Sequence, residues 1–127
     1  LWIMGGALNA VWNVTNDVWS TTNGIDWTQV DAAADWPVRR DFAAVGYNGF
    51  LWVIGGHDQF SAYPEVWRSA NGASWTRVND NAPFGQLIGH SALVFDNKMW
   101  VIGGYDWDSG TFSNSAWSST DGVTWTE

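Results

Sequence analysis

Hydrophobic residues gather into one short run that occurs three times along the chain, and two glycines follow each copy. The runs are Leu1–Met4, Leu51–Ile54 and Met99–Ile102. A run this short, rich in β-branched and aromatic residues, is typical of a buried strand. Because the run returns at a long interval, the pattern predicts an array of repeated supersecondary units.

Three features keep a common register through the repeats. The glycine pairs begin at Gly5, Gly55 and Gly103, and two tryptophan series occupy Trp19, Trp67 and Trp117, and Trp27, Trp75 and Trp125. Successive copies of each feature are 48 or 50 residues apart, and the two tryptophans of one unit are always 8 apart. Only the interval from the glycine pair to the first of these tryptophans varies, at 14, 12 and 14 residues. That interval is therefore predicted to be a loop.

Each unit is predicted to contain four antiparallel strands. The first is expected over Asp41–Tyr47 and His90–Phe95, and the second is the glycine-terminated run. The third strand is expected at Val18–Thr21, Val66–Ser69 and Ala116–Ser119. The fourth is expected at Asp26–Val30, Ser74–Val78 and Thr124–Glu127. Hairpin turns are expected at Asn48-Gly49, Asp96–Lys98, Asn23-Gly24, Asn71-Gly72 and Asp121-Gly122, since Asn-Gly and Asp-Gly favour the positive φ of tight hairpin turns.

A strand closed by a glycine doublet, a later aromatic residue and a tryptophan eight residues further on resemble the kelch repeat. The doublets are Gly5-Gly6, Gly55-Gly56 and Gly103-Gly104, and the resemblance covers the whole chain. The aromatic position, usually tyrosine in kelch repeats, is tryptophan here. The segment Ser119–Trp125 also comes near the Asp-box turn of sialidase-like propellers, but its Asp and Gly are adjacent where that motif separates them. The resemblance implies an all-β fold of kelch-type β-propeller blades.

The repeats divide the chain into residues 1–30, 31–78 and 79–127, all expected to form one domain. The first is expected to be an incomplete blade that lacks its innermost strand, and the other two to be complete. Propellers close with about 4 to 8 blades, so an incomplete propeller is predicted. Either a longer parent chain or association with copies of this chain or with other chains is expected to supply the remaining blades.

Composition narrows the possible partners. The 127 residues include 12 tryptophans and no cysteine, so neither disulfides nor thiolate metal sites are expected. The formal net charge of -8 argues against nucleic acid, which needs clustered Lys and Arg. No apolar run reaches the length of a membrane span.

Strand alternation places the loops after the glycine pairs, and the segments that join units, at one common end of the array. Functional residues are disproportionately carried by such variable loops. The predicted binding residues at this end are Trp12, Trp36, Arg39, Arg40, His57, Asp58, Tyr105, Asp106, Trp107 and Asp108. Aromatic rings with carboxylates between them suit sugars, whose axial hydrogens stack on the rings, and cationic peptides. The alternative for each ring is that it caps the end of a sheet.

The charged and histidine residues of these loops leave alternatives open. Kelch propellers that bind acidic peptides often present arginines in the position of Arg39 and Arg40, but the third unit has Leu87 and Ile88 there. A salt bridge with a neighbouring acid is the favoured interpretation. His57 and His90 could approach one another, but no third ligand accompanies them, and the segment Asp106–Gly110 lacks the distal glutamate of calcium loops, so no metal site is predicted.

The favoured function is a binding or interaction module that holds a protein or glycan at the loop end. No nucleophile elbow, phosphate loop or metal motif is present, so an enzyme is not favoured and no cofactor is expected. The alternatives are part of a carbohydrate-active propeller enzyme, and a structural protein that assembles through exposed blade edges. Tryptophan-rich blades of this style resemble those of secreted bacterial proteins, which favours an extracellular or cell-surface location.

Overall fold

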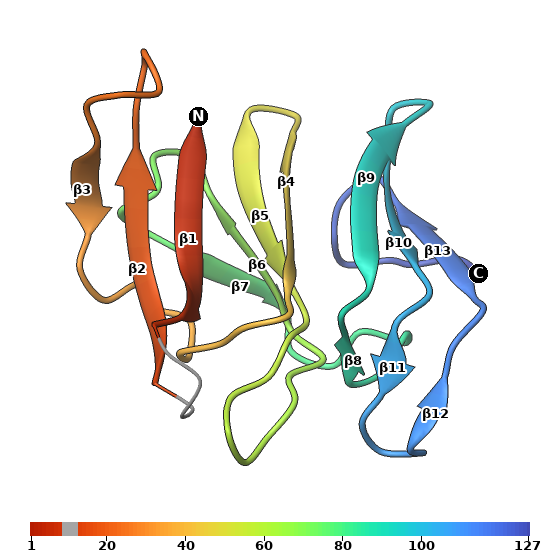
Figure 1. Cartoon of the computed structure of the whole chain (residues 1–127). Helices are drawn as coiled ribbons and strands as arrows, with labels where there is room; N and C mark the ends of the chain where they lie inside the picture. Colours follow the sequence, from red (N-terminus) through yellow and green to blue (C-terminus); the bar gives the residue numbers. More distant parts are fainter. Residues whose placement is uncertain (9–12) are drawn as a thin grey trace.

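The computed structural model describes residues 1–8 and 13–127 and shows small antiparallel sheets standing side by side (Figure 1). In the described residues every regular element is a strand, which confirms the predicted all-β fold. No helix among them is long and apolar enough to cross a membrane. We refer to residues 1–30, 31–78 and 79–127 as the first, second and third units; the last strand of each of the first two runs one residue past these bounds.

The second unit forms the predicted four-stranded sheet, in the order β4-β5-β6-β7. Its strands are β4 (Ala43–Tyr47), β5 (Phe50–Ile54), β6 (Val66–Ser69) and β7 (Thr76–Asn79). The turn between β4 and β5 has two residues, Asn48 and Gly49, with φ of 49° and 79°. Positive φ at both positions is the geometry that Asn-Gly favours, so the predicted tight turn is confirmed here.

The main sheet of each outer unit has three strands. The first unit contains β1 (Trp2–Ala7), β2 (Val14–Ser20) and β3 (Thr28–Asp31). The third contains β9 (Ser91–Phe95), β10 (Lys98–Ile102) and β13 (Ala116–Ser119), and its predicted fourth strand makes only an isolated bridge between Ser118 and Thr126. β1 also differs from prediction, because it continues through its glycine pair with a bulge, whereas β5 and β10 end before theirs.

The turns between the third and fourth strands are wider than the predicted two-residue hairpins. In the third unit, Ser119 Oγ accepts hydrogen bonds from the N–H groups of Asp121 and Gly122, and Asp121 Oδ1 accepts from those of Val123 and Thr124. The first and second units repeat this pattern. Side-chain oxygens therefore bond the turn backbone, which removes the need for positive φ outside the glycine.

Three short strands form a small sheet in segments that were predicted to be loops. β8 (Leu87–Ile88) lies in the segment that joins the second and third units, and β11 (Tyr105–Asp106) and β12 (Thr111–Phe112) form a hairpin after Gly104. The order is β12-β11-β8. In the second unit, Arg40, His57 and Ala62 occupy the corresponding places but form only isolated bridges. The third unit thus carries a more regular loop end than the second.

Adjacent units pack by seating a tryptophan on a glycine. A Cβ atom added at Gly72 would lie 2.5 Å from the Trp2 ring, and one added at Gly122 would lie 2.3 Å from the Trp52 ring. Both distances are below any real Cβ contact, so only glycine fits at these two positions. We call each of these tryptophan–glycine contacts a seat. It joins the strand that carries the tryptophan, β1 or β5, to the wide turn of the next unit.

The two hydrophobic clusters lie between neighbouring units. In the cluster between the first and second units, two rings of the second unit, Trp36 and Trp75, meet edge to face with centroids 5.9 Å apart. In the cluster between the second and third units, two rings of the third unit, Phe84 and Trp125, meet at 5.2 Å. These pairs occupy equivalent positions, 48 and 50 residues apart. Of the nine strand tryptophans expected in the core, Trp52, Trp67, Trp75 and Trp125 are buried and the others are half-buried.

Candidate functional site

The loops that follow the glycine pairs of the second and third units lie at one end of the array. In Figure 1 the 57–64 loop, β8 and the β11–β12 hairpin lie at the lower end, while the tight turns β4–β5 and β9–β10 lie at the upper end. We call the lower end the loop end and the upper end the turn end.

Arg39 forms the buried support of the loop end in the second unit. Its side chain is fully buried, and its guanidinium donates to Glu65 Oε2 at 2.7 Å and to the Gly55 carbonyl at 2.9 Å. The Tyr63 ring lies 4.4 Å from the guanidinium carbon. Burial lowers the pKa of Arg39, and the Glu65 carboxylate opposes that shift. The expected salt bridge is present, but it is buried instead of lying on the surface, so Arg39 is an internal cross-link.

Glu65 shares its carboxylate among three donors. Oε2 accepts from Arg39 and from Trp67 Nε1 at 2.8 Å, and Oε1 accepts from Arg77 at 2.8 Å. Burial by itself would raise the pKa of Glu65, but the hydrogen bonds from Trp67, Arg39 and Arg77 lower it below its usual value. A buried carboxylate held in this way fixes where the 57–64 loop ends and β6 begins.

The 57–64 loop closes around Asp58. Its Oδ1 accepts from the N–H groups of Phe60 and Ser61, and its Oδ2 accepts from the Tyr63 hydroxyl at 2.6 Å. Burial acts to raise the pKa of Asp58, yet these hydrogen bonds lower it overall. Burial and the neighbouring carboxylate raise the pKa of Tyr63 to about 12. Asp58 therefore shapes the loop with both oxygens and leaves Phe60 at the surface, 80% exposed.

His57 joins the loop ends of the second and third units. Its Nε2 lies 3.0 Å from Asp41 Oδ2, its Nδ1 lies 2.6 Å from the Asp58 carbonyl, and its ring lies 5.0 Å from that of Trp107. Arg40 Nε stands 3.7 Å from the same Asp41 oxygen. His57 is buried, whereas the Asp41 side chain is 51% exposed. The junction thus presents a carboxylate to solvent and keeps its imidazole covered.

A cavity of about 400 Å³ opens beside Asp41 between the second and third units. Its lining consists of Asp41, Ile88, Gly89, Gly104, Tyr105, Phe112 and Ser113. The Tyr105 and Phe112 rings meet edge to face with centroids 5.3 Å apart. A volume of this size is within the range of small-ligand sites, about 300–1,000 Å³. We call it the junction pocket.

His90 lies under this end of the second interface. Its ring is buried against Gly55, and neither ring nitrogen has a hydrogen bond of normal geometry, although the carbonyls of Ile54 and Leu87 lie nearby. Burial lowers the pKa of His90 to about 4. His90 is thus neutral at physiological pH, and it does not meet His57 in a ligand set. The described residues contain no group of three or more acidic or histidine side chains placed to hold a metal ion.

The structure brings some predicted site residues together and removes others from the surface. His57, Asp58, Tyr105 and Trp107 lie around the junction, together with Arg40, Asp106 and Asp108 on the same loops. Trp36 and Arg39 are fully buried, so their predicted contact with a partner is replaced by a core role. Trp12 lies outside the described residues.

Asp41 and Phe112 are not among the predicted site residues, although both line the junction pocket. Asp41 follows the arginine pair and was assigned to a strand, yet it has φ of 54° and precedes β4. Phe112 follows the third glycine pair in a segment predicted to be a loop, and its approach to Tyr105 depends on the unpredicted β11–β12 pairing. The repeat offers one signal for Asp41: the equivalent residue of the third unit is Gly89. Asp and Gly both tolerate positive φ, so the pair indicates a turn at this position and not a strand.

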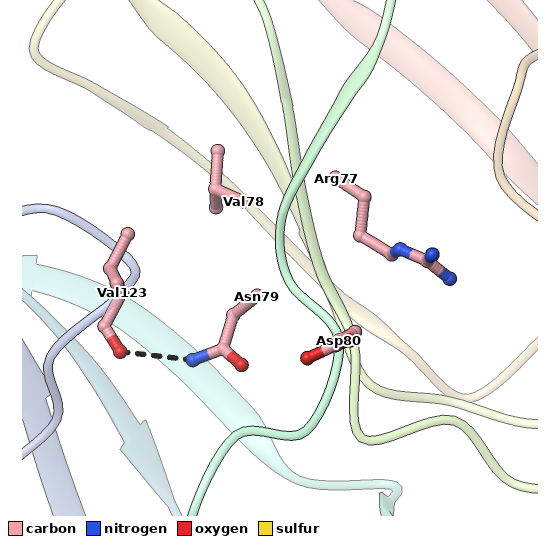
Figure 2. A pocket seen from close by; sticks show the side chains of 5 residues that line it. All are labelled: Arg77, Val78, Asn79, Asp80 and Val123. Carbon is pink, nitrogen blue, oxygen red and sulfur yellow. Dashed lines mark hydrogen bonds between the residues drawn. The ribbon is translucent and has the colours of Figure 1, made fainter.

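Another hollow, of about 540 Å³, lies where the end of β7 meets the wide turn of the third unit. Figure 2 shows the Asn79 amide donating to the Val123 carbonyl at 2.9 Å, while the Arg77 guanidinium points away from both. Arg77 is engaged by Glu65. The lining contains no aromatic ring, and its Arg77 and Asn79 side chains are both engaged, so we treat this hollow as a structural joint rather than the candidate site.

Comparison with known proteins places a family match on the third unit. Residues 87–118 match the family model of the Kelch motif. The match runs from β8 through β13, and so includes the glycine pair, the β11–β12 hairpin and Trp117. A search of curated proteins returned no match.

Proposed function

We propose that this chain, whose third unit carries a kelch motif, is a binding module that holds a protein or glycan at its loop end. The observation that supports the proposal is that three exposed aromatic side chains lie at the loop end, while Phe95, which is 67% exposed, belongs to the apolar face of the third unit. Phe60 and Phe112 are 80% and 85% exposed, and Trp107 is 36% exposed. Exposed rings grouped on one end, with carboxylates among them, favour recognition of a partner.

The turn end offers a contrast within the same molecule. Its β4–β5 and β9–β10 turns are built from Asn48, Gly49, Asp96 and Asn97, and all four residues have positive φ. Their identities are set by backbone geometry. The loop end has no comparable constraint on Phe60 or Phe112, so their exposure favours a role outside the fold.

The test is binding to immobilised glycan and peptide arrays by the purified chain and a double variant, Phe60→Ala with Phe112→Ala. We expect the double variant to lose the signals given by the unchanged chain, because both rings are removed from the proposed contact surface. Circular dichroism and the denaturation midpoint should be unchanged, since both rings are exposed.

Ile25→Ala is the matched control. Ile25 is 80% exposed, like Phe60, but lies in the wide turn of the first unit at the opposite end. Binding should survive in this variant. Equal loss in the control and the double variant would show that the signals come from general surface hydrophobicity, and the proposal would fail.

Self-association is a second candidate, favoured by the apolar face of the third unit. Leu93, Val94, Phe95, Trp100, Ile102 and Ala116 line an open hollow of about 670 Å³. The equivalent tryptophan of the second unit, Trp52, is covered by Gly122. A further sheet unit of the same kind would cover Trp100 in the same manner. Light scattering of the chain and of Phe95→Ser tests this: we expect an oligomer that the variant dissociates, and a monodisperse monomer of the unchanged chain would reject it.

A further inference from the structure

We propose that the junction pocket binds a neutral sugar unit, with one sugar face against Phe112 and one hydroxyl donating to Asp41 Oδ1. The inference rests on the proposed function and names the class of ligand at that same end. It depends on three properties of the pocket: its floor, its aromatic wall and the state of its carboxylate.

The floor is made of backbone. Gly89 and Gly104 line the pocket with φ of 60° and 101°. A Cβ at Gly89 would meet no atom within 4 Å, so the space above it is open, whereas one at Gly104 would lie 2.8 Å from the His90 side chain. Glycine at both positions lets a ligand approach the main chain closely.

The wall is aromatic and held on paired strands. Tyr105 belongs to β11 and Phe112 to β12, and these residues are direct partners in the hairpin. Tyr105 also pairs with Ile88 of β8 on its other side. Pairing on both sides fixes the strand that carries the ring, and a ring positioned in advance binds at lower entropic cost. The exposed face of Phe112 offers an apolar platform for the axial hydrogens of a sugar.

The carboxylate of Asp41 is partly compensated before any ligand arrives. Oδ2 is engaged by His57 at 3.0 Å and lies 3.7 Å from Arg40 Nε. No hydrogen bond or ion pair of the described residues engages Oδ1. A carboxylate with a cation beside one oxygen attracts a second cation less, while its other oxygen still accepts a hydroxyl proton in a strong hydrogen bond.

This balance favours a neutral sugar over charged ligands. Arg40 already lies beside the carboxylate, which weakens the case for a lysine or arginine side chain in the pocket. The formal charge of -8 disfavours an anionic sugar. An open cavity with an aromatic wall and one available acceptor matches the two faces of a pyranose ring, one apolar and one hydroxylated.

The experiment is saturation-transfer NMR on the whole chain with three neutral probes, cellohexaose, xylohexaose and mannohexaose. Hexalysine is the cationic probe and oligogalacturonate the anionic one. We expect at least one neutral hexaose to bind. Phe112→Ala and Asp41→Gly should each weaken it about tenfold or more, because each removes one of the two proposed contacts.

Two replacements of Asp41 separate the hydroxyl acceptor from the charge. Asp41→Gly reproduces the residue of the third unit, Gly89, and Asp41→Asn keeps an acceptor oxygen without the charge; both residues tolerate φ of 54°. For a sugar hydroxyl, Asn should retain binding within about threefold while Gly loses it. Ile25→Ala should bind like the unchanged chain.

Each contrary outcome overturns the inference in a recognisable way. If no neutral hexaose binds, the pocket is not a neutral-sugar site. If hexalysine binds and is lost equally in Asp41→Asn and Asp41→Gly, the site recognises a cation; the sugar inference fails while binding at the loop end stands. If neutral sugars bind but Ile25→Ala abolishes the signal and Phe112→Ala does not, both the inference and the proposed function fail.

Discussion

The two interfaces between neighbouring units share one packing design and differ in the polar residues near the loop end. Trp2 on Gly72 and Trp52 on Gly122 are equivalent seats, and the Trp36–Trp75 and Phe84–Trp125 pairs are equivalent ring contacts. Yet Arg39 and Phe42 of the second unit become Leu87 and His90 in the third. The seats set the spacing of the units, while the residues beside the loops are free to change their chemistry.

The backbone explains why these exchanges are tolerated. The Gly6 N–H donates to the Arg39 carbonyl at 3.1 Å, and the Gly56 N–H donates to the Leu87 carbonyl at the same distance. Main-chain bonds therefore hold both joining segments, whatever the side chain. Substitutions can measure how much each side chain adds to this common frame.

The largest loss of stability is expected when Arg39 is replaced by leucine, the residue that the third unit has at the equivalent position, Leu87. Arg39→Leu leaves the Glu65 carboxylate buried without its shortest partner, and we expect a loss of about 3 kcal/mol in the free energy of unfolding, since breaking a buried pair costs about 3–5 kcal/mol. Arg77 and Trp67 remain as donors, which places the loss at the lower end. Urea denaturation monitored by tryptophan fluorescence measures it.

A second substitution sharpens this result. Arg39→Leu combined with Glu65→Gln keeps an acceptor for Trp67 and removes the unbalanced charge. The double variant should be at least about 1 kcal/mol more stable than Arg39→Leu alone, because an uncompensated buried charge is costly. Equal stabilities would mean that packing around Arg39, and not its ion pair, stabilises the loop end.

The next effect compares two glycines of the same repeat position. Gly122→Ala and Gly24→Ala both place a side chain at φ near 75°, at a cost of about 1–2 kcal/mol. Only Gly122 faces a ring, so its variant should lose about 1–3 kcal/mol more in unfolding free energy, the usual cost of overpacking. Denaturation midpoints of the two variants measure the difference. Equal losses would contradict the seat as the determinant of spacing.

An effect similar in size to the glycine difference is a pH dependence that arises at the second interface. The pKa of His90 is about 4 in the folded chain and near 6.5 when unfolded, so the unfolded state binds more protons in this window. Stability is therefore greatest above about pH 6.5 and falls as pH decreases toward 4, with a loss of about 2 kcal/mol between pH 7 and 5. Thermal unfolding across this range measures the slope.

His90→Phe is the variant that isolates this slope, since the second unit has Phe42 at the equivalent position. It should flatten stability between pH 7 and 5. The carboxylates with lowered pKa values, Asp17, Asp58, Glu65 and Asp121, act below that range. An unchanged slope in the variant would assign the dependence to another group.

Much of the fold could be predicted because its determinants are local in sequence. The apolar runs, the Asn48-Gly49 turn and the repeated tryptophans specify strands and register through side-chain period and backbone geometry. The wide turns were mistaken for tight ones because Asn-Gly favours both. What decides between them is the preceding Thr21, Ser69 or Ser119, whose hydroxyl accepts from the turn backbone.

The site was less predictable because its members depend on contacts between units. Arg39 resembled a surface residue in sequence, and only the positions of Glu65 and the Gly55 carbonyl make it internal. The approach of Asp41 to Tyr105 and Phe112 likewise needs two units side by side. Sequence spacing identified the end of the molecule that carries the candidate site, but not which carboxylate is presented there.

The wide turns have a consequence for how such a protein changes length. The wide turns of the second and third units are each bonded by their own hydroxyl and Asn or Asp side chain, and each contacts a tryptophan of the preceding unit at one glycine, Gly72 or Gly122. Duplication of a whole segment of about 50 residues would therefore add both the glycine that receives the indole of the preceding unit and the indole that packs on the glycine of the following unit. Growth or loss by entire repeats preserves every joint, whereas an insertion inside a turn separates the glycine from its indole.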